Sequence, residues 1–273
     1  MSILKRISFN PLVIRSVRTL GLRTTLRKAY YIWARPRNGI MPVKLGDFDS
    51  RFHVRTPEQL RMLGKAQGGQ WRIEVIEFLD RRLHSGDVVY DVGSNIGVCS
   101  VFAARKVSAK GQVLAFEPGP ETYQSLRDNI ELNGLANLRA FEVALADYNG
   151  RAELIVGDDM LFSSLTKTRN GQTRNQTVRI VEGDSLREEL NLPRPNLVMI
   201  DVEGSEYATI HGLARTLSDP GCTALACEVH PTLLPSPIEP GNILDSMKSC
   251  GFTKIDILRW KGIPEFFAFA SKP

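Results

Sequence analysis

Short apolar runs alternate with longer amphipathic segments from residue 88 to the end of the chain. The alternation predicts strands and helices in turn, because a buried strand is a short apolar run, whereas a helix repeats its apolar positions every three to four residues. The predicted strands are Val88–Val92, Gln112–Glu117, Leu138–Val143, Leu197–Asp201 and Ala224–Val229. The predicted helices are Gly97–Lys106, Glu121–Asn133, Leu186–Leu190, Glu206–Leu217 and Asn242–Cys250. This order predicts an α/β fold with a doubly wound, mostly parallel sheet.

The pattern changes at both ends of this core. Two β-type runs, Thr253–Leu258 and Glu265–Ala270, flank the turn Arg259-Trp260-Lys261-Gly262 and predict a hairpin with an antiparallel strand at the sheet edge. Before residue 88, helical spacing predicts helices from Thr56 to Leu63 and from Gln70 to Leu83, after a hairpin or extended segment.

Two polar segments interrupt the core. Residues 158–179 predict a surface loop or hairpin arm, and residues 230–241 contain four prolines and predict a long irregular loop. Long loops often cover binding sites, so we expect these two segments to shape the pocket for a substrate.

Charge divides the chain into two unequal parts. Residues 1–46 hold no Asp or Glu and ten basic side chains, namely Lys5, Arg6, Arg15, Arg18, Arg23, Arg27, Lys28, Arg35, Arg37 and Lys44. The net charge of +5 therefore comes from this arm, and the rest of the chain is net negative. A negative domain is a poor general binder of nucleic acid, so we predict no nucleic-acid partner. The predicted organisation is a basic arm (1–46), a helical lead-in (47–87) and the main domain (88–273).

Apolar residues recur at helical spacing within the arm, with arginines between them, as at Val13, Val17 and Leu20. A basic amphipathic helix of this type is consistent with peripheral contact with an anionic membrane. It is equally typical of a helix packed on the domain or on an oligomer partner, and organellar targeting peptides have a similar composition.

The remaining composition indicates a cytoplasmic protein, with the arm as a possible peripheral membrane contact. Cys99, Cys222, Cys227 and Cys250 show no C-x-x-C spacing, which favours reduced thiols over a zinc or disulfide site. No apolar run approaches the ~18 residues of a membrane span, and no signal peptide is recognisable.

The strand Val88–Val92 runs directly into a glycine turn, Asp91-Val92-Gly93-Ser94-Asn95-Ile96-Gly97, and an acidic residue, Glu117, ends the next strand. This arrangement is typical of a nucleoside site, where glycines admit the ligand and the second acid accepts hydrogen bonds from the ribose hydroxyls. A dinucleotide site has the spacing G-x-G-x-x-G, but Asn95 replaces its middle glycine and Asp91 would repel a pyrophosphate. S-adenosylmethionine (SAM), which has an ammonium group and no phosphate, therefore fits better than NAD.

A second acidic motif follows the strand Leu197–Asp201, and with it the chain resembles the FkbM-type family of SAM-dependent methyltransferases. The resemblance rests on four segments in matching order: Asp91–Gly97, Phe116-Glu117-Pro118, Asn129–Asn133 and Ile200-Asp201-Val202-Glu203-Gly204-Ser205-Glu206. It implies a class I methyltransferase fold and transfer of a methyl group from SAM to a hydroxyl of a sugar, glycolipid or secondary metabolite. One departure is Met199, because the family usually carries Lys at this position, two residues before the acid.

The carboxyl ends of parallel strands meet at one edge, so the residues that follow them should converge. We expect SAM to contact Asp91, Gly93, Asn95 and Gly97 with its methionine part, Glu117 and Pro118 with its ribose, and Glu142 to Ala144 with its adenine. Asp201 is expected at the junction of cofactor and acceptor.

Methyl transfer to a hydroxyl requires a base, and the candidates for catalytic residues are Asp201, His230 and Glu203. Asp201 ends a buried strand, and His230 has the most suitable ordinary pKa. Glu203 and Glu206 are alternatively typical of the acidic start of a helix. Asp201, Glu203 and Glu228 could also gather a divalent metal, but we predict no metal ligands because no histidine-rich spacing is present. The alternative functions are an NAD(P)-dependent oxidoreductase and a non-catalytic scaffold with a SAM-type fold.

Overall fold

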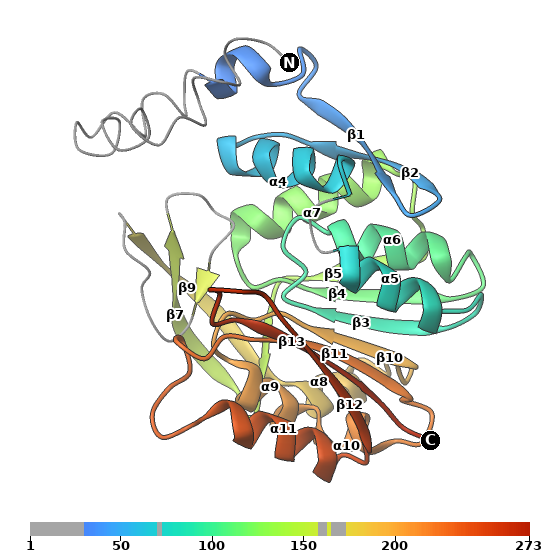
Figure 1. The fold of residues 1–273 in the computed structure, drawn as a ribbon, viewed down its shortest axis with the longest axis vertical. Coiled ribbons are helices and arrows are strands. Elements are labelled where there is room, and N and C mark those ends of the chain that lie inside the picture. Colours follow the sequence, from blue (N-terminus) through green and yellow to red (C-terminus); the bar gives the residue numbers. More distant parts are fainter. Residues whose placement is uncertain (1–29, 70–72, 158–162, 165–172) are drawn as a thin grey trace.

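A seven-stranded sheet forms the centre of the protein (Figure 1). The computed structural model describes residues 30–69, 73–157, 163–164 and 173–273. The strands lie in the order β12 (Lys254–Arg259), β13 (Phe266–Ser271), β11 (Ala224–Val229), β10 (Leu197–Ile200), β3 (Val88–Val92), β4 (Gln112–Phe116) and β5 (Leu138–Phe141). The five strands from β11 to β5 are parallel, and the hairpin β12–β13 adds two antiparallel strands at one edge. The predicted α/β fold and its terminal hairpin are confirmed.

Helices cover both faces of this sheet (Figure 1). One face carries α4 (Pro57–Gln67), α5 (Ile73–Arg82), α6 (Val98–Lys106) and α7 (Pro120–Leu132). The other carries α8 (Gly183–Glu189), α9 (Glu206–Gly212), α10 (Ala214–Ser218) and α11 (Pro240–Ser249). Alternate strand residues point to opposite faces, so Val89 packs in the first core, whereas Tyr90 packs in the second. Burial of both faces explains why the central strands are continuous apolar runs.

The predicted helix Glu206–Leu217 is two helices in the structure. A side chain at Gly212, where α9 ends, would meet the carbonyl oxygen of Ala146 at 1.7 Å. The glycine lets α9 approach the backbone of β6 (Ala144–Ala146), and glycine also weakens a helix interior. The chain resumes its helical course at Ala214.

The lead-in begins with a hairpin, β1 (Ile40–Leu45) and β2 (Phe48–His53), which crosses the predicted domain boundary at residue 46. The hairpin packs into the first core through Val43 and Phe52. Thr56 then caps α4 by accepting a hydrogen bond from the Gln59 N–H at 3.1 Å. The predicted amphipathic helix of residues 1–29 lies outside the described residues. None of the described helices is long and apolar enough to cross a membrane.

A second, four-stranded sheet has the order β6, β9 (Thr173–Glu182), β7 (Gly150–Gly157) and β8 (Ser163–Ser164). The sequence analysis did not predict β6 or β7, although the antiparallel pair β7–β9 agrees with the predicted hairpin arm. β7 and β9 bury Leu154, Val156 and Val178 in one cluster, and the exposed polar residues next to these positions made the segment resemble a loop. The predicted loop of residues 158–179 lies partly outside the described residues.

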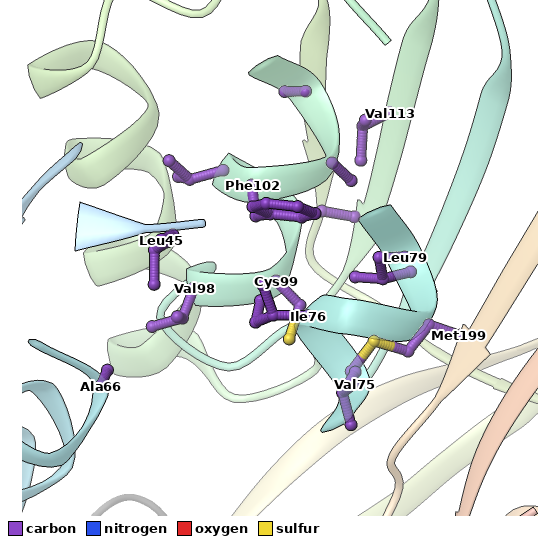
Figure 2. Close-up of a cluster of buried hydrophobic side chains, with 14 of the residues drawn as sticks. Leu45, Ala66, Val75, Ile76, Leu79, Val98, Cys99, Phe102, Val113 and Met199 are labelled. Carbon is purple, nitrogen blue, oxygen red and sulfur yellow. The ribbon is translucent and has the colours of Figure 1, made fainter. Parts of the chain in front are cut away.

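Figure 2 shows part of the first core, where α5 and α6 meet the sheet. Met199 of β10 belongs to this cluster with Val75 and Leu79, and it is only 4% exposed. An apolar side chain at position 199 is therefore compatible with the packing of α5 over β10.

Candidate active site

A cavity of about 520 Å³ opens at the carboxyl ends of β3, β4 and β10. The segments that line it follow these three strands and include Gly93, Glu117 and Asp201. Cavities that bind small molecules typically measure roughly 300–1,000 Å³. The convergence of the strand ends, which the sequence predicted, therefore produces a cavity of suitable size for a nucleoside cofactor and part of an acceptor.

The glycine turn brings the loop after β3 against the loop after β10. Gly93 has φ +84°, and a Cβ at this position would meet the carbonyl oxygen of Asp201 at 1.9 Å. Only glycine fits such an approach in this conformation. Gly97, with φ +89°, precedes the first residue of α6, and a Cβ there would meet Leu126 Cδ1 at 2.5 Å. Gly97 shapes the turn but is not part of the cavity wall.

Glu117 is buried and held by two backbone donors. Its Oε2 accepts a hydrogen bond from the Asn95 N–H and its Oε1 accepts one from the Gly119 N–H, each at 2.9 Å. An ionised carboxylate has about four acceptor positions, so each oxygen keeps capacity for another donor. Burial raises the pKa of Glu117 to about 7, against the lowering effect of the two N–H groups.

Asp91 is fixed at the other end of the glycine turn. Its carboxylate accepts a hydrogen bond from the Ser100 hydroxyl of α6, and its carbonyl oxygen accepts one from the Ser94 hydroxyl at 2.6 Å. Asp91 lines the cavity, so it offers a negative charge to a cationic ligand.

Four carboxylates surround His230 where β10 and β11 end side by side. His230 Nδ1 lies 2.7 Å from Glu206 Oε1, and its Nε2 lies 3.4 Å from Glu203 Oε2. The same Nε2 is 3.8 Å from Asp201 Oδ1 and 4.0 Å from Glu228 Oε1. Parallel pairing of β10 with β11 explains the cluster, because it places the residues after Ile200 beside those at the end of β11.

His230 is protonated at neutral pH in this cluster. Burial opposes the imidazolium charge, but the hydrogen bond to Glu206 and the charges of Glu203 and Asp201 outweigh it and raise the pKa of His230 to about 10. A protonated imidazole donates protons and cannot accept one. The raised pKa therefore favours His230 as the group that holds the carboxylates over His230 as a base.

Asp201, Glu203 and His230 are also the described residues that could hold a metal ion. One ligand atom from each lies within 4.8 Å of the others. The prediction of no metal ligands rested on the absence of histidine-rich spacing in the sequence. In the structure His230, rather than Glu228, completes the group with Asp201 and Glu203. A divalent ion would compete with the proton on His230 for the same nitrogen.

Glu203 and Glu206 differ in their local structure. Glu206 is the first residue of α9, is fully buried, and accepts a hydrogen bond from the Gly204 N–H at 2.9 Å. Glu206 thus lies at the start of a helix, as predicted, and also contacts His230 in the cluster of carboxylates. Glu203 lies before the helix in a left-handed conformation, with φ +50°, and lines the cavity.

The cavity contains most of the predicted site residues but not all. The members that line it are Asp91, Gly93, Asn95, Glu117, Pro118, Ala144, Asp201 and Glu203. Glu142 is exposed and lies outside the wall, which Val143 and Leu145 complete instead. His230 lies behind the wall, in contact with Asp201 and Glu203. The expected pocket loops, 158–179 and 230–241, contribute no described residue to it.

One part of the cavity wall, formed by α4, was not predicted from the sequence. Arg61, Met62 and Lys65 line the cavity, and Ile263 from the β12–β13 turn joins them. The spacing of Arg61 and Lys65 places both on one helix face. No pattern in the sequence indicates that this helix face covers the cavity, because α4 precedes the sheet and docks on it only through tertiary packing.

Most of the chain matches one known protein family. The model of the methyltransferase FkbM domain matches residues 91–254, from the glycine turn to β12. The chain belongs to the FkbM methyltransferase family. This family and the related class I folds use SAM, so the protein is a SAM-dependent methyltransferase. The assignment confirms the predicted family and cofactor and argues against the NAD(P)-dependent alternative.

The relatives of this FkbM protein include a hexuronic acid methyltransferase and a 2-O-methyltransferase. It is 29% identical over 182 residues to the hexuronic acid methyltransferase AglP of Haloferax volcanii, covering 65% of this chain and 70% of AglP. It is 31% identical over 146 residues to the 2-O-methyltransferase NoeI of Sinorhizobium fredii, covering 48% of this chain and 59% of NoeI. A solved SAM-dependent methyltransferase from Agrobacterium tumefaciens has the same fold, with a TM-score of 0.50 and 12% identity over 88% of this chain and 72% of that one.

The site fits an adenosyl cofactor on its own geometry. The cofactor loop lines the cavity through Gly93 and Asn95, and Glu117 beside it keeps acceptor capacity for two hydroxyl donors. The prediction of no nucleic-acid partner is not tested by these observations and stays a prediction.

Proposed function

We propose that this FkbM protein is an O-methyltransferase whose acceptor is a hydroxyl of a sugar, glycolipid or secondary metabolite. The name of AglP, a hexuronic acid methyltransferase, supports a sugar among these, and the name of NoeI, a 2-O-methyltransferase, supports transfer to an oxygen. The observation that carries the proposal is that two carboxylates, Asp201 and Glu203, line the same cavity as the cofactor loop. An ionised carboxylate beside a hydroxyl can accept the hydroxyl proton, and methylation of a hydroxyl requires this proton to be removed.

Three groups of residues hold the cofactor in this proposal. Asp91, Gly93 and Asn95 contact its methionine part, Asp91 by attracting the ammonium group. Glu117 accepts hydrogen bonds from the ribose hydroxyls, beside Pro118. When bound, SAM supplies a methyl carbon that is electrophilic because it is attached to a sulfonium. Of the predicted adenine residues Glu142 to Ala144, Val143 and Ala144 line the cavity and lie beside the adenine in this proposal, whereas Glu142 is exposed.

Asp201 acts as the base for the acceptor. Its backbone touches the cofactor loop at Gly93 and its carboxylate lines the cavity, so it can reach a hydroxyl that is oriented toward the methyl group. The hydroxyl proton moves to the Asp201 carboxylate as the new C–O bond forms. Glu203 lies on the same wall and accepts a hydrogen bond from the acceptor. His230 positions both acids through its charge.

The N-terminal segment contacts an anionic membrane in the same proposal. Tyr30, Ile32 and Trp33 are 59%, 74% and 77% exposed, and Arg35 and Arg37 follow them on the surface. Aromatic and aliphatic side chains next to arginines are typical of segments that lie at the interface of an anionic bilayer. The ten basic and no acidic residues of segment 1–46 supply the matching charge.

Incubation of the purified protein with methyl-labelled SAM and a panel of glycosides tests the reaction. We expect label in a methyl ether, which survives mild alkali. A methyl group released by mild alkali would be a carboxyl ester, and label on an amine would be N-methylation. Either result would contradict the proposed transfer to a hydroxyl.

A further inference from the structure

Helix α4 brings two cationic side chains to the active-site cavity. Arg61 and Lys65 are one helical turn apart, both are exposed, and both line the cavity. Leu60 and Leu63 pack in the first core, and Met62 is buried beside the cavity. The helix is therefore held on the sheet at a fixed place, which keeps the two cations at the cavity wall.

The charges that line the cavity are divided between its walls. The strand ends contribute Asp91, Glu117, Asp201 and Glu203, whereas α4 contributes Arg61 and Lys65. Within the described part of the chain, neither of these cations forms an ion pair with an acid. A ligand in the cavity therefore meets acids from the strand ends and unneutralised cations from α4.

The position of α4 in the chain separates it from the shared family architecture. The FkbM domain match begins at residue 91, whereas α4 ends at Gln67. Helix α4 thus lies outside the matched domain and supplies a wall of the cavity that does not come from the cofactor loops. Such a wall is suited to recognition of the acceptor.

We propose that Arg61 and Lys65 form a binding site for the anionic group of an acidic acceptor, which directs one of its hydroxyls toward Asp201. This inference rests on the proposed O-methyl transfer and specifies its substrate class. An arginine and a lysine suit a carboxylate or a phosphate, which both accept charge-assisted hydrogen bonds. SAM carries a carboxylate as well, so the test must distinguish the acceptor from the cofactor.

Calorimetric titration of the protein loaded with S-adenosylhomocysteine (SAH) tests the inference without relying on turnover. The probes are methyl glucuronide, methyl glucoside and glucose 6-phosphate. We expect the two anionic sugars to bind about tenfold more tightly than methyl glucoside, which one charge-assisted contact can supply. Glucuronide favoured over sugar phosphate identifies a carboxylate site, and the reverse identifies a phosphate site.

The variants Arg61→Ala and Lys65→Ala should each remove most of this preference and leave the affinity for methyl glucoside unchanged. Arg61→Lys should restore part of it. The matched control is Arg81→Ala on α5, whose side chain is 67% exposed and does not line the cavity.

Equal affinity for acidic and neutral sugars, or binding of none of the three probes, would overturn the inference. If Arg61→Ala weakens the binding of SAH instead, the cations hold the cofactor carboxylate and the acceptor assignment is wrong. Binding of glucuronide that depends on Arg61, without any methyl transfer, would contradict the proposed reaction and leave the anion site in place.

Discussion

The carbonyl oxygen of Asp201 lies 1.9 Å from the point where a Cβ on Gly93 would stand. Gly93 belongs to the cofactor loop after β3, and Asp201 begins the acidic segment after β10. The two strands are parallel neighbours, with Ile200 paired to Val92, so their following residues meet. The family motifs are thus in direct contact, and the missing side chain of Gly93 is what allows it.

Replacement of Gly93 by alanine should therefore abolish cofactor binding or unfold the domain. The new Cβ would meet backbone atoms, which cannot move aside as a flexible side chain can. The backbone at position 93 also has φ +84°, a conformation that residues with a side chain rarely adopt. Gly86→Ala is the matched control, because Gly86 also has positive φ but has no atom within 4 Å of its Cβ position. Calorimetric titration with SAH and thermal unfolding measure both variants. If both bind SAH equally well, the contact with Asp201 is not what requires glycine.

The affinity for SAH should depend on pH through Glu117. Its pKa is raised to about 7, and only the ionised form accepts hydrogen bonds with both oxygens. Below pH 7 the group must lose a proton when the ligand binds, so the affinity should fall by up to about tenfold per pH unit. Above pH 7 it should level off.

Glu117→Gln should bind SAH more weakly at pH 8 and show a nearly flat profile between pH 5.5 and 8. Glu142→Gln, at an exposed acid outside the cavity, should retain the profile of the native protein. An unaltered slope in Glu117→Gln would assign the titration to another group.

Stability should fall in alkali because of His230. Its pKa is raised to about 10 in the folded protein, above its usual value of 6.5. The resulting stabilisation is complete below pH 6.5 and is lost as the pH rises toward 10. Unfolding temperatures measured from pH 6.5 to 9.5 should decline, and His230→Gln should remove part of the decline.

The comparison between variants isolates this effect from the titration of lysines and cysteines. His84→Gln serves as the control, since the His84 side chain is 79% exposed. It should show the same decline as the native protein. A His230→Gln variant that loses stability with pH as steeply as the His84 control would contradict the charged cluster.

Membrane contact should depend on Trp33. Trp33→Ser removes a large apolar side chain that is 77% exposed, so sedimentation with vesicles containing phosphatidylserine should weaken by about tenfold. Salt should weaken the binding of the native protein as well. Ile257→Ser, at an exposed position on β12, is the control and should sediment normally. No vesicle binding by the native protein would rule out this part of the proposal.

The central strands of the main sheet, β3, β4, β10 and β11, were predictable because they are buried on both faces. A run such as Val88–Val92 is apolar throughout, and the prediction matches β3. The second sheet was missed because β9 alternates exposed and buried residues over most of its described length and is no continuous apolar run. The turn signals Asn149-Gly150 and Asn170-Gly171, next to β7 and β9, could have identified it. The break at Gly212 depends on contact with Ala146, which is distant in the sequence.

The site residues also divide into those that local sequence makes predictable and those that depend on tertiary packing. Glycines and acids at strand ends were predictable, since the order of the strands brings those ends together. The environment of His230 was not predictable, because it depends on burial and on four acids from two segments, residues 201–206 and the end of β11. Arg61 and Lys65 could not be placed either, since their position depends on how α4 docks.

Asp201→Asn provides the most direct test of the proposed reaction. The variant keeps the backbone that contacts Gly93 but cannot take a proton from a hydroxyl. We predict that SAH still binds, whereas methyl transfer to the best glycoside acceptor falls by about 100-fold or more. An unchanged rate of transfer would show that Asp201 is not the base. A native protein that binds SAH and methylates no hydroxyl acceptor would contradict the proposed function and favour the scaffold alternative.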